Sequence, residues 1–233
     1  MQSLLRRLKY YGIGFGFGLL FVIFFFKNRG CTWLPSNRVK NSVQERLIVL
    51  PEDQELFMKQ EGLAFSDVLN IIEKGDVDFS ASLKHSDPKV YLFEGANSKG
   101  DEMKVYITLP SESFVSEVHV MESSINNVKN TRKGMGKLIS FPKDKQLLYM
   151  DSTEVLDQQK KKFGITNSDQ ILKWVKKSGN IDFSRTNFRI KPKVEHVITC
   201  KDDKGRELAL KAVWYKEKIN VISIDLADSS SKD

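Results

Sequence analysis

The chain carries one sequence pattern twice. Residues 67–80 read DVLNIIEKGDVDFS, and residues 169–184 read DQILKWVKKSGNIDFS. In both copies an amphipathic stretch leads to a glycine and then to an Asp-Phe-Ser triplet, and the similarity continues at a nearly constant offset on either side. Self-similarity over such a length predicts two copies of one small domain.

Each copy predicts the same order of elements. Hydrophobic periodicity and turn residues in the first copy indicate a short strand or helix lead-in at 47–50, helices at 51–62 and 66–75, and strands at 89–93, 103–109 and 115–120. The matching segments of the second copy are 147–150, 153–163, 168–179, 193–199, 207–213 and 219–226. Ser66 and Ser168 are the predicted N-caps of the second helix in each copy.

The predicted fold class is therefore α+β. We expect an N-terminal transmembrane helix followed by two tandem repeats, each of two helices and a three- to four-stranded antiparallel sheet. The segment between the copies is rich in Ser, Asn, Lys and Gly and lacks apolar periodicity, so it indicates a flexible linker. The predicted parts are an anchor at 1–30, a polar spacer at 31–44, repeat 1 at 45–122, the linker at 123–136, repeat 2 at 137–228 and a tail at 229–233.

Residues 10–26 contain no charged side chain. A helix of about 17 residues spans roughly 26 Å, close to the ~30 Å hydrocarbon core of a bilayer. A signal peptide is the main alternative, but it needs small residues before a cleavage site, and no such site follows Phe26. We therefore expect an uncleaved, single-pass membrane anchor that contacts the lipid bilayer through residues 10–26.

The orientation of this anchor depends on the basic residues at its ends. Arg6, Arg7 and Lys9 precede the apolar segment, and Lys27 and Arg29 follow it. The positive-inside comparison is close to a tie. Because a short leader with adjacent arginines is hard to translocate, we expect the N-terminus in the cytoplasm and the domains outside it.

Four glycines at alternate positions in the apolar segment raise the hypothesis of a homodimer. They are Gly12, Gly14, Gly16 and Gly18. Small residues four apart let two membrane helices approach closely. Glycine is also common in single membrane helices, and these four lie on two faces.

The net charge of +7 is distributed unevenly. Residues 44–121 carry 7 basic and 15 acidic side chains, whereas residues 137–228 carry 19 basic and 13 acidic ones. The two copies therefore have opposite net charge. Three explanations are compatible with the opposite charges: evolutionary drift of solvated surface residues, docking of the two copies on each other, and an anionic partner of the second copy.

Basic residues gather in the second copy's helices and the segment after them. They are Lys160, Lys161, Lys162, Lys173, Lys176, Lys177, Arg185, Arg189, Lys191 and Lys193. A solvated face, an anionic lipid surface and a protein partner are all compatible with this cluster. Nucleic acid is not an expected partner, because binding it would need exposed aromatic residues and Trp174 falls in the apolar stripe of its helix.

The histidines give no sign of a duplicated active site. His85, His119 and His196 each match a different residue type in the other copy. A general acid or base used by both copies would occupy equivalent positions. Cys31 and Cys200 form neither a disulfide framework nor part of a metal-ligand cluster. We therefore expect no catalytic residue, no cofactor and no metal ligand, and we predict that the protein is not an enzyme.

The shared Asp-Phe-Ser triplet has two interpretations. Asp78 and Asp182, with Ser80 and Ser184, could line a groove. Alternatively, Asp and Ser make local side chain to backbone bonds at a turn, while the phenylalanine fills the core. We favour the local interpretation.

The layout of each unit resembles the small α+β domains of the RelE- and ParE-like ribonuclease toxins. It is more similar still to an uncharacterised bacterial domain family that often follows one membrane helix. The residues that carry this resemblance are CTWLPSNR at 31–38, GDVDFS at 75–80 and KVYLFEG at 89–95. The resemblance implies a fold and no established activity.

These observations favour a non-catalytic, single-pass membrane protein that presents two small α+β domains for binding or scaffolding at the membrane surface. The alternative is an RNase-toxin-like enzyme or nucleic-acid-binding protein with cytoplasmic domains. The location of the domains relative to the membrane distinguishes the two.

Overall fold

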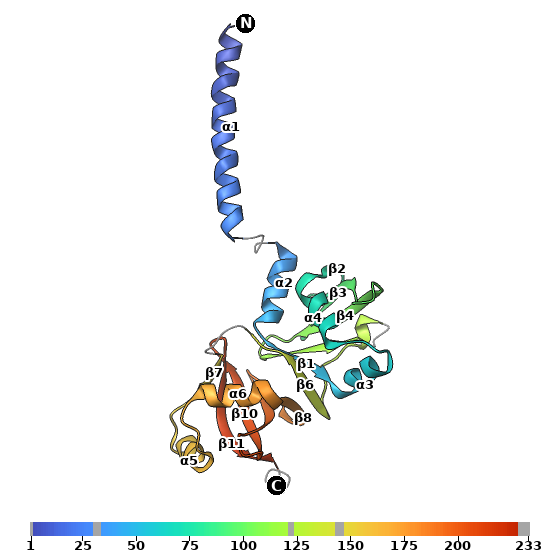
Figure 1. Ribbon diagram of the computed structural model, residues 1–233, viewed down its shortest axis with the longest axis vertical. Helices are drawn as coiled ribbons and strands as arrows, with labels where there is room; N and C mark the ends of the chain where they lie inside the picture. The colour runs from blue at the N-terminus through green and yellow to red at the C-terminus, as the bar shows by residue number, and fades with distance from the viewer. Residues whose placement is uncertain (1, 30–33, 121–123, 143–146, 228–233) are drawn as a thin grey trace. The chain divides into compact units, whose positions relative to one another are not determined.

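The computed structural model describes residues 2–29, 34–120, 124–142 and 147–227 (Figure 1). The chain divides into two compact units, residues 1–41 and residues 42–233. Within the described residues the protein is α+β, with six α-helices and one large mixed sheet.

The first unit is dominated by α1 (Gln2–Arg29), a helix of 28 residues. Residues 6–24 of α1 are long and apolar enough to cross a membrane, and they are not buried. Helix α2 (Pro35–Gln44) begins in this unit and ends in the second. The predicted polar spacer is therefore helical from residue 35, because Pro35 suits the first position of a helix and Val39 and Val43 are spaced one turn apart.

The second unit has two halves with the same order of elements. The first half comprises β1 (Leu47–Pro51), α3 (Glu52–Gln60), α4 (Phe65–Lys74), β2 (Asp76–Leu83), β3 (Lys89–Ala96), β4 (Glu102–Leu109) and β5 (Val115–His119). The second half comprises β7 (Leu148–Met150), α5 (Glu154–Phe163), α6 (Ser168–Ser178), β8 (Asn180–Asn187), β9 (Glu195–Lys201), β10 (Glu207–Tyr215) and β11 (Lys218–Leu226). Between them lie the short helix η1 (Ile125–Asn127) and strand β6 (Met135–Ser140).

The strands form a single sheet in the order β2-β3-β4-β5-β1-β6-β8-β9-β10-β11-β7. Strand β1 is parallel to β5, and β7 is parallel to β11. Strand β6 pairs antiparallel with both β1 and β8 and so joins the two halves. The prediction of two separate antiparallel sheets differs from this arrangement, because the parallel pairs and the β6 pairs connect segments whose partners no local pattern reveals.

Residues 124–136, whose composition predicts a flexible linker, pack against the first half in the structure. Val128 is buried in a small cluster with Val90, Leu92 and Tyr106 of the first half. The backbone N–H of Thr131 donates to the buried carboxylate of Glu117 at 2.8 Å. The segment is therefore held against the first half by an apolar contact and a hydrogen bond.

Helices α4 and α6 begin slightly earlier than predicted. Ala64, not Ser66, precedes α4, and its N–H donates to the side chain of Asp67 at 3.0 Å. Asn167, not Ser168, caps α6 by accepting a bond from the N–H of Gln170 at 3.0 Å. Both helices end where predicted, at Gly75 and Gly179.

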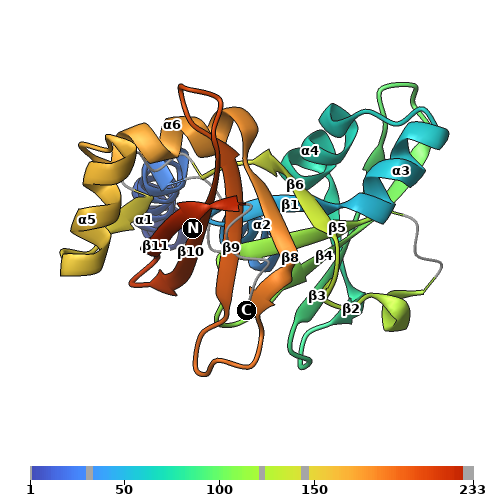
Figure 2. The ribbon, with the colours of Figure 1, turned by 90° about the horizontal axis from the view of Figure 1, so that it is seen from below.

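The main core extends across both halves. Val49 and Phe114 of the first half belong to the same buried cluster as Phe183 and Ile198 of the second. Trp174 is 2% exposed in this cluster, as its place in the apolar stripe predicts. Figure 2 shows helices α3 to α6 along one side of the sheet. Burial of one continuous core makes residues 42–233 a single compact unit.

Candidate functional site at the seam between the halves

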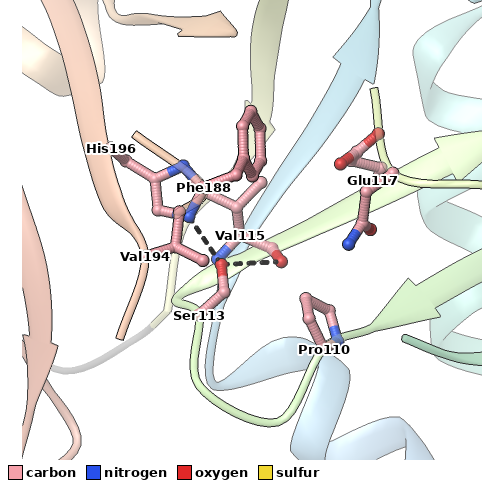
Figure 3. Close-up of a pocket in the computed structure, with 8 residues that line it drawn as sticks. Pro110, Ser113, Val115, Glu117, Phe188, Val194 and His196 are labelled. Atoms are coloured by element: carbon pink, nitrogen blue, oxygen red, sulfur yellow. Dashed lines mark hydrogen bonds between the residues drawn. The ribbon is translucent and has the colours of Figure 1, made fainter. Parts of the chain in front are cut away.

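A small pocket lies at the seam, which we define as the region where the first half and the segment after it meet the second half (Figure 3). Its volume is about 20 Å³, enough for one water molecule. The residues that line it are Pro110, Ser113, Val115, Glu117, Asn130, Phe188, Val194 and His196. We take this pocket as the candidate site because it combines a buried hydroxyl, an imidazole and a carboxylate.

Ser113 and His196 are hydrogen-bonded across the seam. Ser113 lies in the β4–β5 connection and His196 lies in β9, and their Oγ and Nε2 atoms are 2.7 Å apart. The imidazole ring also contacts Phe114 and Phe188, with ring centroids 4.9 and 6.2 Å away. Complete burial lowers the pKa of His196 from 6.5 to about 3, so the ring is neutral at physiological pH.

The arrangement lacks what a serine nucleophile needs. In such a site the histidine Nε2 accepts the hydroxyl proton while a carboxylate holds Nδ1–H. Nδ1 of His196 has no hydrogen-bond partner in the described part of the chain. Ser113 Oγ also accepts a bond from the N–H of Val115 at 3.0 Å, which fixes the hydroxyl in the loop. The pair is therefore suited to joining the halves and not to acyl transfer.

Glu117 is the only carboxylate among the residues that line the pocket, and it is 3% exposed. Its Oε2 accepts the bond from Thr131 and lies 3.7 Å from Nε2 of His119. Pairing of β5 with β1 places Glu117 beside Val49, and pairing of β11 with β7 places Val221 beside Met150. The corresponding position of the second half is thus apolar, so this carboxylate belongs to one half only.

The three histidines do not converge. His85 is exposed in the β2–β3 connection, His119 ends β5 beside Glu117, and His196 is buried at the seam. In the described residues, no group of three or more His, Cys, Asp and Glu side chains could hold a metal ion. Cys200 is buried, which raises the pKa of its thiol to about 12, and Cys31 lies outside the described residues.

The Asp-Phe-Ser triplets make the local bonds that we expected. Oδ1 of Asp78 accepts from the backbone N–H of Ser80 and of Ala81. Oδ1 of Asp182 accepts from the backbone N–H of Arg185, while its Oδ2 accepts from the guanidinium of Arg185 at 2.6 Å. Both triplets lie where the pairing register of their strand shifts. At such a shift some backbone N–H groups lose their partner on the neighbouring strand, and the Asp side chains accept bonds from N–H groups there. Phe183 is completely buried and Phe79 is half-buried.

The predicted basic cluster is not one uniform surface. Lys160 is paired with Asp157 at 2.6 Å, and Arg185 is paired with Asp182. Lys161, Lys173 and Lys176 are exposed on α5 and α6.

The four glycines of the apolar segment lie in α1; they are Gly12, Gly14, Gly16 and Gly18. A Cβ atom added to any of them would meet no neighbouring atom within 4 Å, so each could accept a side chain.

Sequence reasoning missed a pair of glutamines, one in α3 and one in α5, that accept a backbone N–H from the last strand of each half or from just after it. Oε1 of Gln54 in α3 accepts from the N–H of Val120, just after β5, at 2.8 Å. Oε1 of Gln159 in α5 accepts from the N–H of Ile224 in β11 at 2.9 Å. The two bonds have the same role, although the residues do not stand at the same place in the two helices. Only their common type, a glutamine in the first helix of each copy, could have suggested it.

No protein-family model matches the chain, and no curated protein or solved structure matches it significantly. The resemblance to the toxin-like domains therefore stays a prediction.

Proposed function

We propose that this is a single-pass membrane protein whose α1 anchors a duplicated, non-catalytic α+β unit for binding or scaffolding at the membrane surface. The observation that carries the proposal is the exposed apolar surface of α1, where Phe15 and Phe17 are 72% and 64% exposed. A helix with apolar residues on all sides needs a hydrocarbon environment or a protein partner. Its length matches the bilayer, which favours the former.

Three features support duplication of the α+β unit. The strand order within the first half, β2-β3-β4-β5-β1, is the same as the order β8-β9-β10-β11-β7 in the second. In each half the last strand runs parallel to the first. A glycine ends the second helix of each half by donating its N–H to a carbonyl four residues earlier.

The hairpins after β3 and β9 give the most detailed support. Oδ1 of Asn97 accepts from the N–H groups of Lys99 and Asp101. Oδ1 of Asp202 accepts from the N–H groups of Lys204 and Arg206. The glycines of the two turns, residues 100 and 205, have φ of 89° and 79°. The two hairpins thus have equivalent hydrogen bonds and equivalent glycine conformations, as expected of two copies of one unit.

A binding or scaffolding role fits the side chains better than catalysis does. In the seam pocket Ser113 is bonded to His196 and Glu117 accepts a backbone N–H, and His196 has a pKa too low for a general base at neutral pH. The features shared by the two halves are structural: glycine ends, hairpin bonds, triplets and strand order. A duplication that keeps structure without a common set of reactive groups favours presentation of surfaces.

A pair of reporters fused after Asp233 tests this proposal in a bacterial host. A reporter active only outside the cytoplasm should be active, and one active only in the cytoplasm should be silent. The opposite pattern would overturn our orientation and favour the toxin-like alternative. Purified full-length protein should also leave RNA intact, and cleavage lost in the His119→Ala variant would contradict the non-catalytic role.

A further inference from the structure

The second half carries a surface where basic and aromatic side chains lie together at one end of its sheet. Lys193, from the β8–β9 connection, has its Nζ 5.5 Å from the ring centroid of Tyr215 at the end of β10. Lys216, in the β10–β11 turn, has its Nζ 5.2 Å from the same ring. These contacts bring two connections side by side. We name this surface the basic–aromatic patch; its cations are Arg132, Arg189, Lys191, Lys193, Lys216 and Lys218.

The basic–aromatic patch also exposes apolar side chains. Ile190 is 42% exposed and Tyr215 is 47% exposed. The guanidinium of Arg132 lies 4.1 Å from the ring centroid of Phe188, at the start of the same connection. Only Glu195 and Glu217 carry acidic side chains in residues 188–195 and 213–218, so the patch is positive as well as partly apolar.

The turn beside Tyr215 has an unusual backbone. Lys216 and Glu217 have φ of 47° and 62°, a left-handed conformation that non-glycine residues adopt rarely. Two such residues in succession make a tight hairpin turn whose twist matches that of its strands. The turn thus holds Tyr215 and Lys216 at a fixed place on the end of the sheet.

The corresponding connections of the first half form no comparable surface. Its β2–β3 connection, residues 84–88, reads KHSDP, and its β4–β5 connection, residues 110–114, reads PSESF. Each contains an acidic residue, and the one aromatic side chain of the two segments, Phe114, is fully buried. The basic–aromatic patch is therefore a property of the second half and accounts for part of the difference in charge between the halves.

We propose that the basic–aromatic patch binds the anionic lipid headgroups of the bilayer that carries α1. This inference rests on the anchoring role proposed above. Lysine and arginine are attracted to the negative surface of a bilayer, and exposed tyrosine and isoleucine side chains insert at its interface. At most about 60 Å of extended chain separates residue 24 from residue 42, so the second unit stays close to a membrane that holds α1.

Hydrogen exchange of the full-length protein tests the proposal. The protein is reconstituted into phosphatidylcholine vesicles with or without phosphatidylserine. We expect exchange at residues 189–193 and 215–218 to be about tenfold slower with phosphatidylserine. The variant Lys191→Glu/Lys193→Glu/Lys216→Glu should lose this protection. The matched control Lys161→Glu/Lys173→Glu/Lys176→Glu makes the same change of charge on exposed helix residues and should keep it.

Each failure has a distinct result. Equal exchange in both vesicle types, with protein that sediments with both, overturns lipid binding and leaves the anchor in place. If the protein does not sediment with phosphatidylcholine vesicles, the proposed anchoring by α1 is contradicted. If that protein does sediment once phosphatidylserine is added, lipid binding by the basic–aromatic patch is still supported. Protection by single-stranded RNA or by an acidic protein, with none by phosphatidylserine, would overturn the proposal in favour of that partner.

Discussion

Ser113 of the first half and His196 of the second are joined by a buried hydrogen bond of 2.7 Å between Oγ and Nε2. The two residues are 83 positions apart in the sequence. This bond and strand β6, which pairs with both halves, join the two halves of residues 42–233 in addition to their shared core. The residues of the seam therefore allow direct tests of how the two halves are held together.

Replacement of Ser113 by alanine should destabilise the protein. The change leaves Nε2 of His196 and the N–H of Val115 without their partner in a buried site, which costs about 1–3 kcal/mol. Urea unfolding in mild detergent measures the free energy. Ser111→Ala, at an exposed position of the same connection, should change it by less than about 0.5 kcal/mol. Equal effects of the two variants would contradict a role of the bond in the seam.

The stability of the protein should fall as the pH falls below 6.5. The pKa of His196 is about 3 in the folded protein, against 6.5 ordinarily. Between these values the unfolded chain binds the proton and the folded chain does not, so acid favours unfolding by up to about 1.4 kcal/mol per pH unit. Urea unfolding at pH 5 and pH 7 measures the slope. The His196→Phe variant should flatten it, whereas His85→Gln, at an exposed position, should leave it unchanged.

Gly136 should not tolerate a side chain. A Cβ at this position of β6 would lie 2.5 Å from both the Phe183 ring and the Val49 side chain, one from each half. Gly136→Ala should therefore lower the free energy of unfolding by about 2–3 kcal/mol. Gly100→Ala provides the comparison, since its Cβ meets no atom within 4 Å and only its φ of 89° is unfavourable. If Gly136→Ala lowers the free energy of unfolding less than Gly100→Ala does, the prediction is wrong and β6 can shift to make room for a side chain.

The thiol of Cys200 should react only when the protein unfolds. Burial raises its pKa to about 12, so at pH 8 the reactive thiolate is about a thousandfold rarer than for a thiol of ordinary pKa 9.0. The Cys31→Ser variant leaves Cys200 as the single cysteine. A thiol reagent should then react slowly in buffer and rapidly in denaturing urea. Rapid reaction in buffer would mean that the second half opens readily.

The elements that the sequence predicted well are those specified by local chemistry. Helix α5 begins after Thr153, which caps it, and ends at Gly164, whose φ of 72° suits glycine. Strand β4 alternates apolar and polar residues, and the sequence predicts its bounds to within one residue. These signals depend only on neighbours in the chain.

The elements that were missed depend on contacts between distant residues. Strand β6 contains Gly136 and follows a polar stretch rich in Asn, Ser and Lys, yet it is ordered by pairing with β1 and β8. The parallel pairs β1–β5 and β7–β11 have no turn between them to predict their partnership. The Ser113–His196 bond joins two single residues with no shared motif, so sequence spacing could not indicate the candidate site.

Alkaline extraction of membranes tests the anchor, the central claim, most directly. Carbonate at high pH strips proteins bound to the membrane surface and leaves those that span it. Full-length protein should stay in the membrane pellet. The variant Phe15→Lys/Leu19→Lys should be released, because each charge at the helix centre costs about 2.5–3.5 kcal/mol in the bilayer. Release of the unaltered protein into the supernatant would contradict the claim that α1 spans a membrane.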